Sequence, residues 1–288
     1  PLIRETFSEA ADILKQDLWA LAHEGPAEAL NSTVNTQPIM LTAGIAVYRA
    51  WESLRGKKPD YLAGHSLGEY TALVVSGALT FSDALRLVSY RAKIMLECVP
   101  EGVGGMAAIV GLDDDEIRVV CAETMRNCEG MLLEPANFNS PGQVVIAGHK
   151  NAIQQAMELS KAKGVKLTIL LPMSIPSHCS LMKPAAKQMR QLLEKISFAS
   201  PTIPVLHNVD VQQHHDAASL REILAKQLYS PVRWTETVRT FASTGVDHVI
   251  ECGPGKILVG LTKRIDGKLK SLSLTDSNVL KQTIDLLK

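Results

Sequence analysis

The pentapeptide GHSLG at residues 64–68 constrains the fold of this chain more than any other stretch. It follows a short segment, 60–63, that suits the end of a buried strand, and it precedes a segment, 69–75, that suits a helix. A G-x-S-x-G sequence in this setting is typical of a sharp strand-to-helix turn that exposes the serine hydroxyl. The pattern therefore predicts an α/β fold with Ser66 as a candidate nucleophile. A glycine-rich loop with an incidental serine is the alternative, because short motifs recur by accident.

A serine nucleophile needs a base, and the sequence offers two histidines to weigh against each other. His65 is adjacent to Ser66, but neighbouring side chains on a turn usually diverge, so it is a poor base. His178 follows the last strand of an inserted segment, and Pro176 restricts the backbone before it. His178 is therefore the candidate base, and a buried, hydrogen-bonded structural histidine is the alternative interpretation.

The stretch 103–173 differs in rhythm from the rest of the chain. After the glycine-rich break at 102–105, strands and helices are expected in the order β-α-β-β-α-β, over 106–110, 113–127, 131–136, 143–147, 151–163 and 166–171. This order predicts a ferredoxin-like subdomain at 103–173, inserted into a core formed by 1–102 and 174–288. The core is expected to hold helices over 5–22, 37–54, 81–97, 182–195, 217–228 and 234–244, and a strand over 246–251.

Composition excludes several classes of protein. Of the 288 residues 46% are hydrophobic and 21% charged, which is typical of a globular chain. Thirty basic and thirty acidic residues balance, so there is no general attraction to nucleic acid. No apolar run is long enough to span a membrane. The five cysteines are scattered without metal-ligand spacing, which predicts reduced thiols in the cytoplasm and no metal site.

Several short motifs follow one another along nearly the whole chain. They are Gln37-Pro38, GHSLGEY at 64–70, Arg91, NFNSPGQ at 137–143, PSH at 176–178, QLY at 227–229, PVRW at 231–234 and GPG at 253–255. The serine pentapeptide alone is weakly specific, but the ordered set is highly specific and resembles the bacterial-type malonyl-CoA:acyl-carrier-protein transacylase family. The resemblance implies an α/β-hydrolase-like core with a parallel sheet and an inserted ferredoxin-like subdomain.

The resemblance also implies a two-step acyl transfer. Ser66 would attack malonyl-CoA to form an O-malonyl-serine, with His178 as base, and the malonyl group would then move to the phosphopantetheine thiol of acyl carrier protein. In such enzymes a backbone carbonyl orients the base, and the matching position is Gln227. The backbone N–H of Leu67 would donate to the oxyanion. The CoA thioester and the phosphopantetheine carrier are substrates, so no cofactor is expected.

Four further residues are implied as substrate contacts. Arg91 would bind the malonyl carboxylate, because a planar guanidinium can donate two parallel hydrogen bonds to it. Without the resemblance, a surface arginine in a weak salt bridge is the simpler interpretation. His65, Asn137 and Asn139 would lie near the substrate. For His65 the alternative is support of the serine turn, and for the two asparagines it is formation of the Pro141-Gly142 turn.

One departure from the family pattern is expected to matter. Members normally carry an N-terminal strand followed by a Gly-Gln-Gly-Ser-Gln loop, whose glutamine supplies a second oxyanion donor, and this motif does not occur in the sequence. We therefore expect this chain to be weak or inactive unless that segment is restored. Three other classes stay open: an acyltransferase domain of a polyketide synthase, a serine thioesterase or hydrolase, and a noncatalytic carrier-binding subunit.

Overall fold

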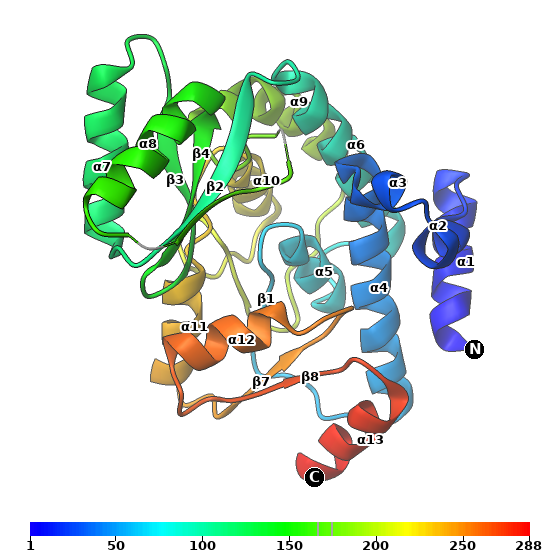
Figure 1. Cartoon of the computed structure of the whole chain (residues 1–288). Helices are drawn as coiled ribbons and strands as arrows, with labels where there is room; N and C mark the ends of the chain where they lie inside the picture. Colours follow the sequence, from blue (N-terminus) through cyan, green and yellow to red (C-terminus); the bar gives the residue numbers. More distant parts are fainter. Residues whose placement is uncertain (166, 174) are drawn as a thin grey trace.

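Parallel and antiparallel strands occupy different parts of the molecule in the computed structural model, which describes residues 1–165, 167–173 and 175–288 (Figure 1). The antiparallel strands form one sheet of four. The parallel strands form two separate pairs. The expected α/β class, with parallel strands in the core, is confirmed.

The antiparallel sheet lies in the middle of the chain, with strands in the order β3-β4-β2-β5. Its elements are β2 (Gly104–Val110), α7 (Asp114–Asn127), β3 (Leu133–Ser140), β4 (Gln143–His149), α8 (Lys150–Ala162) and β5 (Leu167–Leu170). The predicted element order is therefore observed. Residues 166 and 174, where the last predicted strand and the second core segment begin, lie outside the described residues. The domain boundaries stay a prediction.

Alternation along these strands explains how the sheet packs. Ala107 and Ile109 point to one face, where they share a core with α7 and α8, which cover that face in Figure 1. Met106 and Ala108 point to the other face and pack with Cys179, next to the candidate base. Because successive side chains of a strand alternate between faces, one sheet supports both its own core and the loop that carries His178.

The two parallel pairs flank a large cleft. β1 (Leu62–Ala63) pairs with β6 (Val205–Leu206), and β7 (His248–Glu251) pairs with β8 (Lys270–Ser273). The cleft has a volume of about 1130 Å³ and is lined by residues of both β1 and β7.

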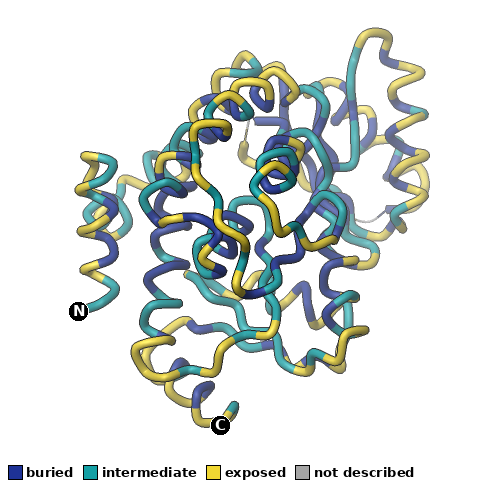
Figure 2. Tube along the Cα trace, turned by 180° about the vertical axis from the view of Figure 1, so that it is seen from behind, coloured by how far each residue is buried: buried dark blue, intermediate teal, exposed yellow. Residues whose placement is uncertain are grey.

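Helices surround these sheets and form the main apolar core. They are α1 (Leu2–Leu14), α2 (Leu18–Glu24), α3 (Ala27–Asn31), α4 (Thr33–Ser53), α5 (Gly68–Val75), α6 (Phe81–Cys98), the short 3-10 helix η1 (Ser180–Met182), α9 (Lys183–Leu193), α10 (Ala217–Gln227), α11 (Trp234–Ser243), α12 (Ile257–Ile265) and α13 (Ser277–Leu286). Buried residues of α4, α5 and α6 pack together in the main apolar core. Exposed residues lie mainly toward the outside of the molecule (Figure 2). Within the described ranges, no helix has both the length and the apolar character needed to cross a membrane.

The prediction of a single helix over 5–22 is wrong. Lys15 adopts a left-handed backbone conformation with φ of 56° and ends α1, and the Asp17 side chain then caps α2 by accepting the N–H of Ala20. The core strand expected at 246–251 is present as β7. The short β6, with two residues, offered no alternation from which it could be predicted.

Candidate active site

The GHSLG turn joins β1 to α5 and holds Ser66 in a strained conformation. Ser66 has φ of 51°, which costs a non-glycine residue about 1–3 kcal/mol. Gly64 is required, because a Cβ there would lie 1.9 Å from the carbonyl carbon of Gly68. A Cβ on Gly68 would meet no atom within 4 Å, so only one of the two glycines is needed for close approach.

The structure brings His178 to Ser66 across 112 residues of sequence. The Ser66 hydroxyl lies 2.7 Å from His178 Nε2, and His178 Nδ1 lies 2.8 Å from the backbone oxygen of Gln227. Since a carbonyl oxygen only accepts, Nδ1 must carry the proton, which leaves Nε2 free to accept from the serine. The buried, hydrogen-bonded histidine and the candidate base are thus the same residue.

The surroundings keep the His178 ring neutral. Burial, and after it the positive charge of Arg91, lower its pKa from 6.5 to about 3. His178 also has a positive φ, 62°, and its N–H donates to the backbone oxygen of Leu228 at 2.9 Å. A neutral ring aimed at a serine hydroxyl can take its proton.

Arg91 lies in the interior beside the serine. Its side chain is only 2% exposed, so the interpretation as a surface arginine is wrong. The guanidinium donates to Gln37 Oε1 at 2.6 Å, to Ser66 Oγ at 3.1 Å and to Gln227 Oε1 at 3.1 Å. All three acceptors are uncharged, and within the described residues Arg91 Nε has no partner. A buried cation bound only by neutral groups is well suited to a carboxylate ligand.

The three other predicted substrate contacts differ in their placement. His65 Nε2 bonds to Asn139 Oδ1 at 2.8 Å, and both residues line the large cleft. Desolvation lowers the pKa of His65 below 6.5. Asn137 is buried, and its backbone forms a bridge with Val232. The structure thus joins His65 to Asn139, while the role of Asn137 at the site stays a prediction.

Leu67 supplies the first backbone N–H after the nucleophile. In the described part of the chain, neither a backbone nor a side-chain acceptor bonds to this N–H, whereas the next three N–H groups bond within the turn. Leu67 also lines the large cleft. An unoccupied donor at this position can serve an oxygen that becomes negative on the substrate.

Four residues that sequence reasoning did not assign complete the site. Gln37, Glu69, His207 and Asn208 are all buried, and each makes a hydrogen bond within this network. Gln37 was noted in the motif series without a role. Glu69 reads as an ordinary acidic residue in the first turn of a helix. His207 and Asn208 follow the two-residue strand β6. Their position beside the serine turn becomes clear only from the parallel pairing of β6 with β1.

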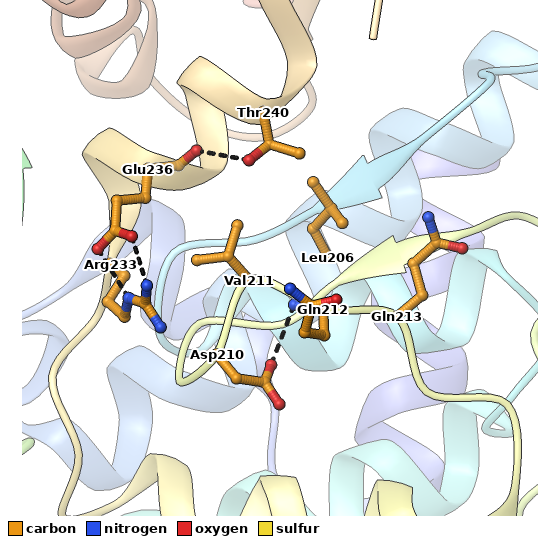
Figure 3. Close-up of a pocket in the computed structure, with 8 residues that line it drawn as sticks. All are labelled: Leu206, Asp210, Val211, Gln212, Gln213, Arg233, Glu236 and Thr240. Atoms are coloured by element: carbon orange, nitrogen blue, oxygen red, sulfur yellow. Dashed lines mark hydrogen bonds and ion pairs between the residues drawn. The ribbon is translucent and has the colours of Figure 1, made fainter. Parts of the chain in front are cut away.

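A second, smaller hollow is lined by residues of β6, of the following loop and of α11 (Figure 3). Its volume is about 380 Å³, and its charged groups are already engaged: Arg233 pairs with Glu236, and Asp210 accepts the N–H of Gln212 at 3.1 Å. None of the candidate catalytic residues lines it. Among the described residues, no three side chains of His, Cys, Asp or Glu gather as a metal site would require.

Comparison with known proteins agrees with this geometry. The acyl transferase domain family matches residues 3–268, which include every candidate site residue. A malonyl CoA-acyl carrier protein transacylase of Escherichia coli strain K12 is 51% identical over 286 residues, covering 99% of this chain and 92% of that protein. The chain belongs to the malonyl CoA-acyl carrier protein transacylase family. The relative from Bacillus subtilis strain 168 is 41% identical and is covered to 90% by the whole of this chain.

Solved structures of the family have the same fold. The transacylase of Coxiella burnetii superimposes with a TM-score of 0.97 at 46% identity, covering 99% of this chain and 89% of that one. A malonyl-transacylase in complex with a type II PKS acyl-carrier protein also gives a TM-score of 0.97, at 48% identity, covering 99% of this chain and 92% of that one. The family resemblance drawn from the ordered motifs is therefore confirmed.

Proposed function

We propose that this protein transfers a malonyl group from malonyl-CoA to the phosphopantetheine thiol of acyl carrier protein, a step of fatty acid biosynthesis. One observation carries the proposal: the Ser66 hydroxyl lies 2.7 Å from His178 and 3.1 Å from the buried guanidinium of Arg91. The candidate base and the candidate carboxylate receptor therefore both contact the hydroxyl of the candidate nucleophile. The curated relatives, named malonyl CoA-acyl carrier protein transacylases, support the same reaction.

In the first half-reaction, Ser66 Oγ attacks the thioester carbonyl while its proton moves to His178 Nε2. The backbone carbonyl of Gln227 holds Nδ1–H and stabilises the ring as it becomes positive. Leu67 N–H donates to the oxyanion of the tetrahedral intermediate. When the carbon–sulfur bond breaks, His178 returns the proton to the CoA sulfur, and the malonyl group remains as an ester on Ser66.

In the second half-reaction, the thiol of the carrier's phosphopantetheine takes the place of CoA. His178 removes the thiol proton, and the sulfur attacks the malonyl ester. The ester bond breaks, and His178 gives the proton to Ser66 Oγ, which restores the enzyme. The side chains, the thioester malonyl-CoA and the thiol of the carrier account for every step, so we expect no cofactor. The five free thiols support a cytoplasmic location.

Arg91 would give the reaction its preference for malonyl. The charged carboxylate of malonyl can accept hydrogen bonds from the guanidinium, whereas an acetyl group leaves the buried cation without an anion. We propose that His65 and Asn139 border the acyl group from the cleft side and that Asn137 supports this edge. We also propose that 103–173 is a distinct subdomain on the core of 1–102 and 174–288, which its separate apolar core supports.

Mass spectrometry after exposure to malonyl-CoA tests the proposal. The protein should gain one malonyl group on Ser66, and addition of holo acyl carrier protein should move the group to the carrier. Ser66→Ala should gain none, while Ser160→Ala, which removes a buried hydroxyl from α8, should behave as the parent. Release of free malonate instead of carrier transfer would identify a hydrolase. Absence of labelling both in this chain and in one with the Gly-Gln-Gly-Ser-Gln segment restored would contradict the proposal and favour a binding module.

A further inference from the structure

The turn at Ser66 is held by a side chain from another part of the chain. Ser66 adopts φ of 51°, and such a conformation persists only where its surroundings fix it. Two hydrogen bonds lie within the turn: the Gly68 N–H donates to the His65 carbonyl, and the Glu69 N–H donates to the Ser66 carbonyl. They leave the Ser66 N–H and the Gly64 carbonyl to be satisfied from outside.

Asn208 satisfies both groups with one carboxamide. Its Oδ1 accepts the N–H of Ser66 at 2.7 Å, and its Nδ2 donates to the carbonyl of Gly64 at 2.7 Å. Asn208 is fully buried and lies two residues beyond β6, which runs parallel to β1 in the register Ala63↔Leu206. The strand pairing therefore carries Asn208 alongside the turn. We propose that Asn208 is a positioning residue that clamps the nucleophile turn of this enzyme.

A buried carboxylate fixes the clamp in turn. Glu69 Oε2 accepts the backbone N–H of Asn208 at 3.0 Å and Nε2 of Gln227 at 2.9 Å, and its Oε1 accepts from His207 Nδ1 at 2.7 Å. Gln227 also donates to the Ser66 carbonyl at 2.9 Å and orients His178 through its backbone oxygen. One carboxylate thus ties the nucleophile turn to the segment that aims the base.

The clamp acts on the serine and leaves the acyl receptor in place. Arg91 is held by Gln37 and Gln227 in addition to its bond to Ser66 Oγ, and among the described residues no hydrogen bond joins it to Asn208. Loss of the clamp should therefore slow acylation of Ser66 without weakening malonyl-CoA binding. This expectation rests on the proposed function, because it assumes that malonyl-CoA acylates Ser66.

Rapid-quench mass spectrometry of malonyl-enzyme formation tests the clamp. Asn208→Ala should lower the acylation rate constant about a hundredfold, with the malonyl-CoA concentration at half-maximal rate nearly unchanged. Ser160→Ala removes an equally buried hydrogen bond far from the turn and should keep the parent rate. If the parent is not acylated even with the Gly-Gln-Gly-Ser-Gln segment restored, the proposed function fails. If the parent is acylated and folded Asn208→Ala matches its rate, the clamp is refuted.

Asn208→Asp gives a second, independent readout, which also serves if Asn208→Ala does not fold. An ionised carboxylate can accept from Ser66 N–H but cannot donate to the Gly64 carbonyl, whereas the protonated acid does both. The titratable groups near this position are Glu69 and His207 in the clamp, Arg91 and His178 bonded to Ser66, His65 next to Ser66, and Arg233, whose backbone N–H donates to the Asn208 carbonyl. Because the pKa of His178 is about 3, the base stays neutral at pH 5. The ratio of the variant rate to the parent rate should rise at least about tenfold from pH 8 to pH 5. A ratio of variant rate to parent rate that does not change between pH 8 and pH 5 overturns the proposal.

Discussion

The antiparallel sheet of β2 to β5 and the polar network around Ser66 are both buried, yet different interactions hold them. In the sheet, Ile109 and Ile146 are fully buried among other apolar side chains, so stability is spread over many weak contacts. In the network, Glu69, His207 and Gln227 are equally buried but depend on a few hydrogen bonds. Removing one such partner leaves another buried polar group unsatisfied. Substitutions in the sheet should therefore change stability, and substitutions in the network should change chemistry.

The largest expected effect is the loss of the base. His178→Ala should lower the rate of malonyl transfer about a thousandfold, because general acid–base catalysis contributes on this scale. The matched control is His149→Ala at the end of β4, where the ring accepts the N–H of Leu132 at 2.8 Å. Steady-state kinetics and thermal melting of both variants should show a slow, folded enzyme in the first case and an active, less stable one in the second. A destabilised but active His178→Ala, together with a stable but slow His149→Ala, would contradict the contrast between the network and the sheet.

A smaller and more selective effect is expected at the carboxylate receptor. Arg91→Ala should lower malonyl transfer about a hundredfold, the loss expected for charge-assisted hydrogen bonds, and acetyl transfer far less. Arg190→Ala is the control, since Arg190 pairs with Glu222 at 2.8 Å on a partly exposed surface. Parallel assays with malonyl-CoA and acetyl-CoA give the ratio. Equal losses for the two donors would exclude carboxylate recognition by Arg91.

The same contrast explains what could be predicted from the sequence. The sheet was predictable because β2 and β4 are short, mainly apolar runs next to turn signals, and Gly142, with φ of 73°, closes the β3–β4 hairpin. Ser66, His178 and Arg91 could be singled out because short motifs and a family resemblance point to them. Their geometry required the structure, since no local pattern says which side chains a turn will meet.

Asn208 shows where prediction from sequence ends. It bonds to Ser66 across 142 residues, and the strand that delivers it has only two residues. Glu69 looks like a solvated acid in the first turn of α5, yet it is fully buried because three donors converge on it. Polar groups that are buried for function violate the local pattern, so periodicity assigns them to the surface.

The neutral state of His178 should also appear in the pH dependence of stability. The folded pKa is about 3 and the unfolded pKa about 6.5, so between these values the unfolded chain binds more protons and stability falls as pH falls. From pH 7.5 to pH 5 this residue should remove about 2 kcal/mol from the free energy of unfolding. Urea unfolding of the parent and His178→Ala at both pH values measures the difference. Parallel pH curves for the two proteins would show that the folded pKa is not depressed.

The smallest expected effect is a change in stability caused by a substitution in the antiparallel sheet, and it tests directly whether the sheet and the polar network differ. Ile146→Val in β4 removes one buried methyl group and should lower the free energy of unfolding by about 1 kcal/mol. Val119→Ala, on an exposed position of α7, should change it by less than about 0.5 kcal/mol. Urea midpoints measure both, and the malonyl-transfer rate per folded molecule should equal that of the parent in each. A slower rate in Ile146→Val would mean that sheet packing reaches the His178 loop through the opposite face, where Met106 and Ala108 contact Cys179.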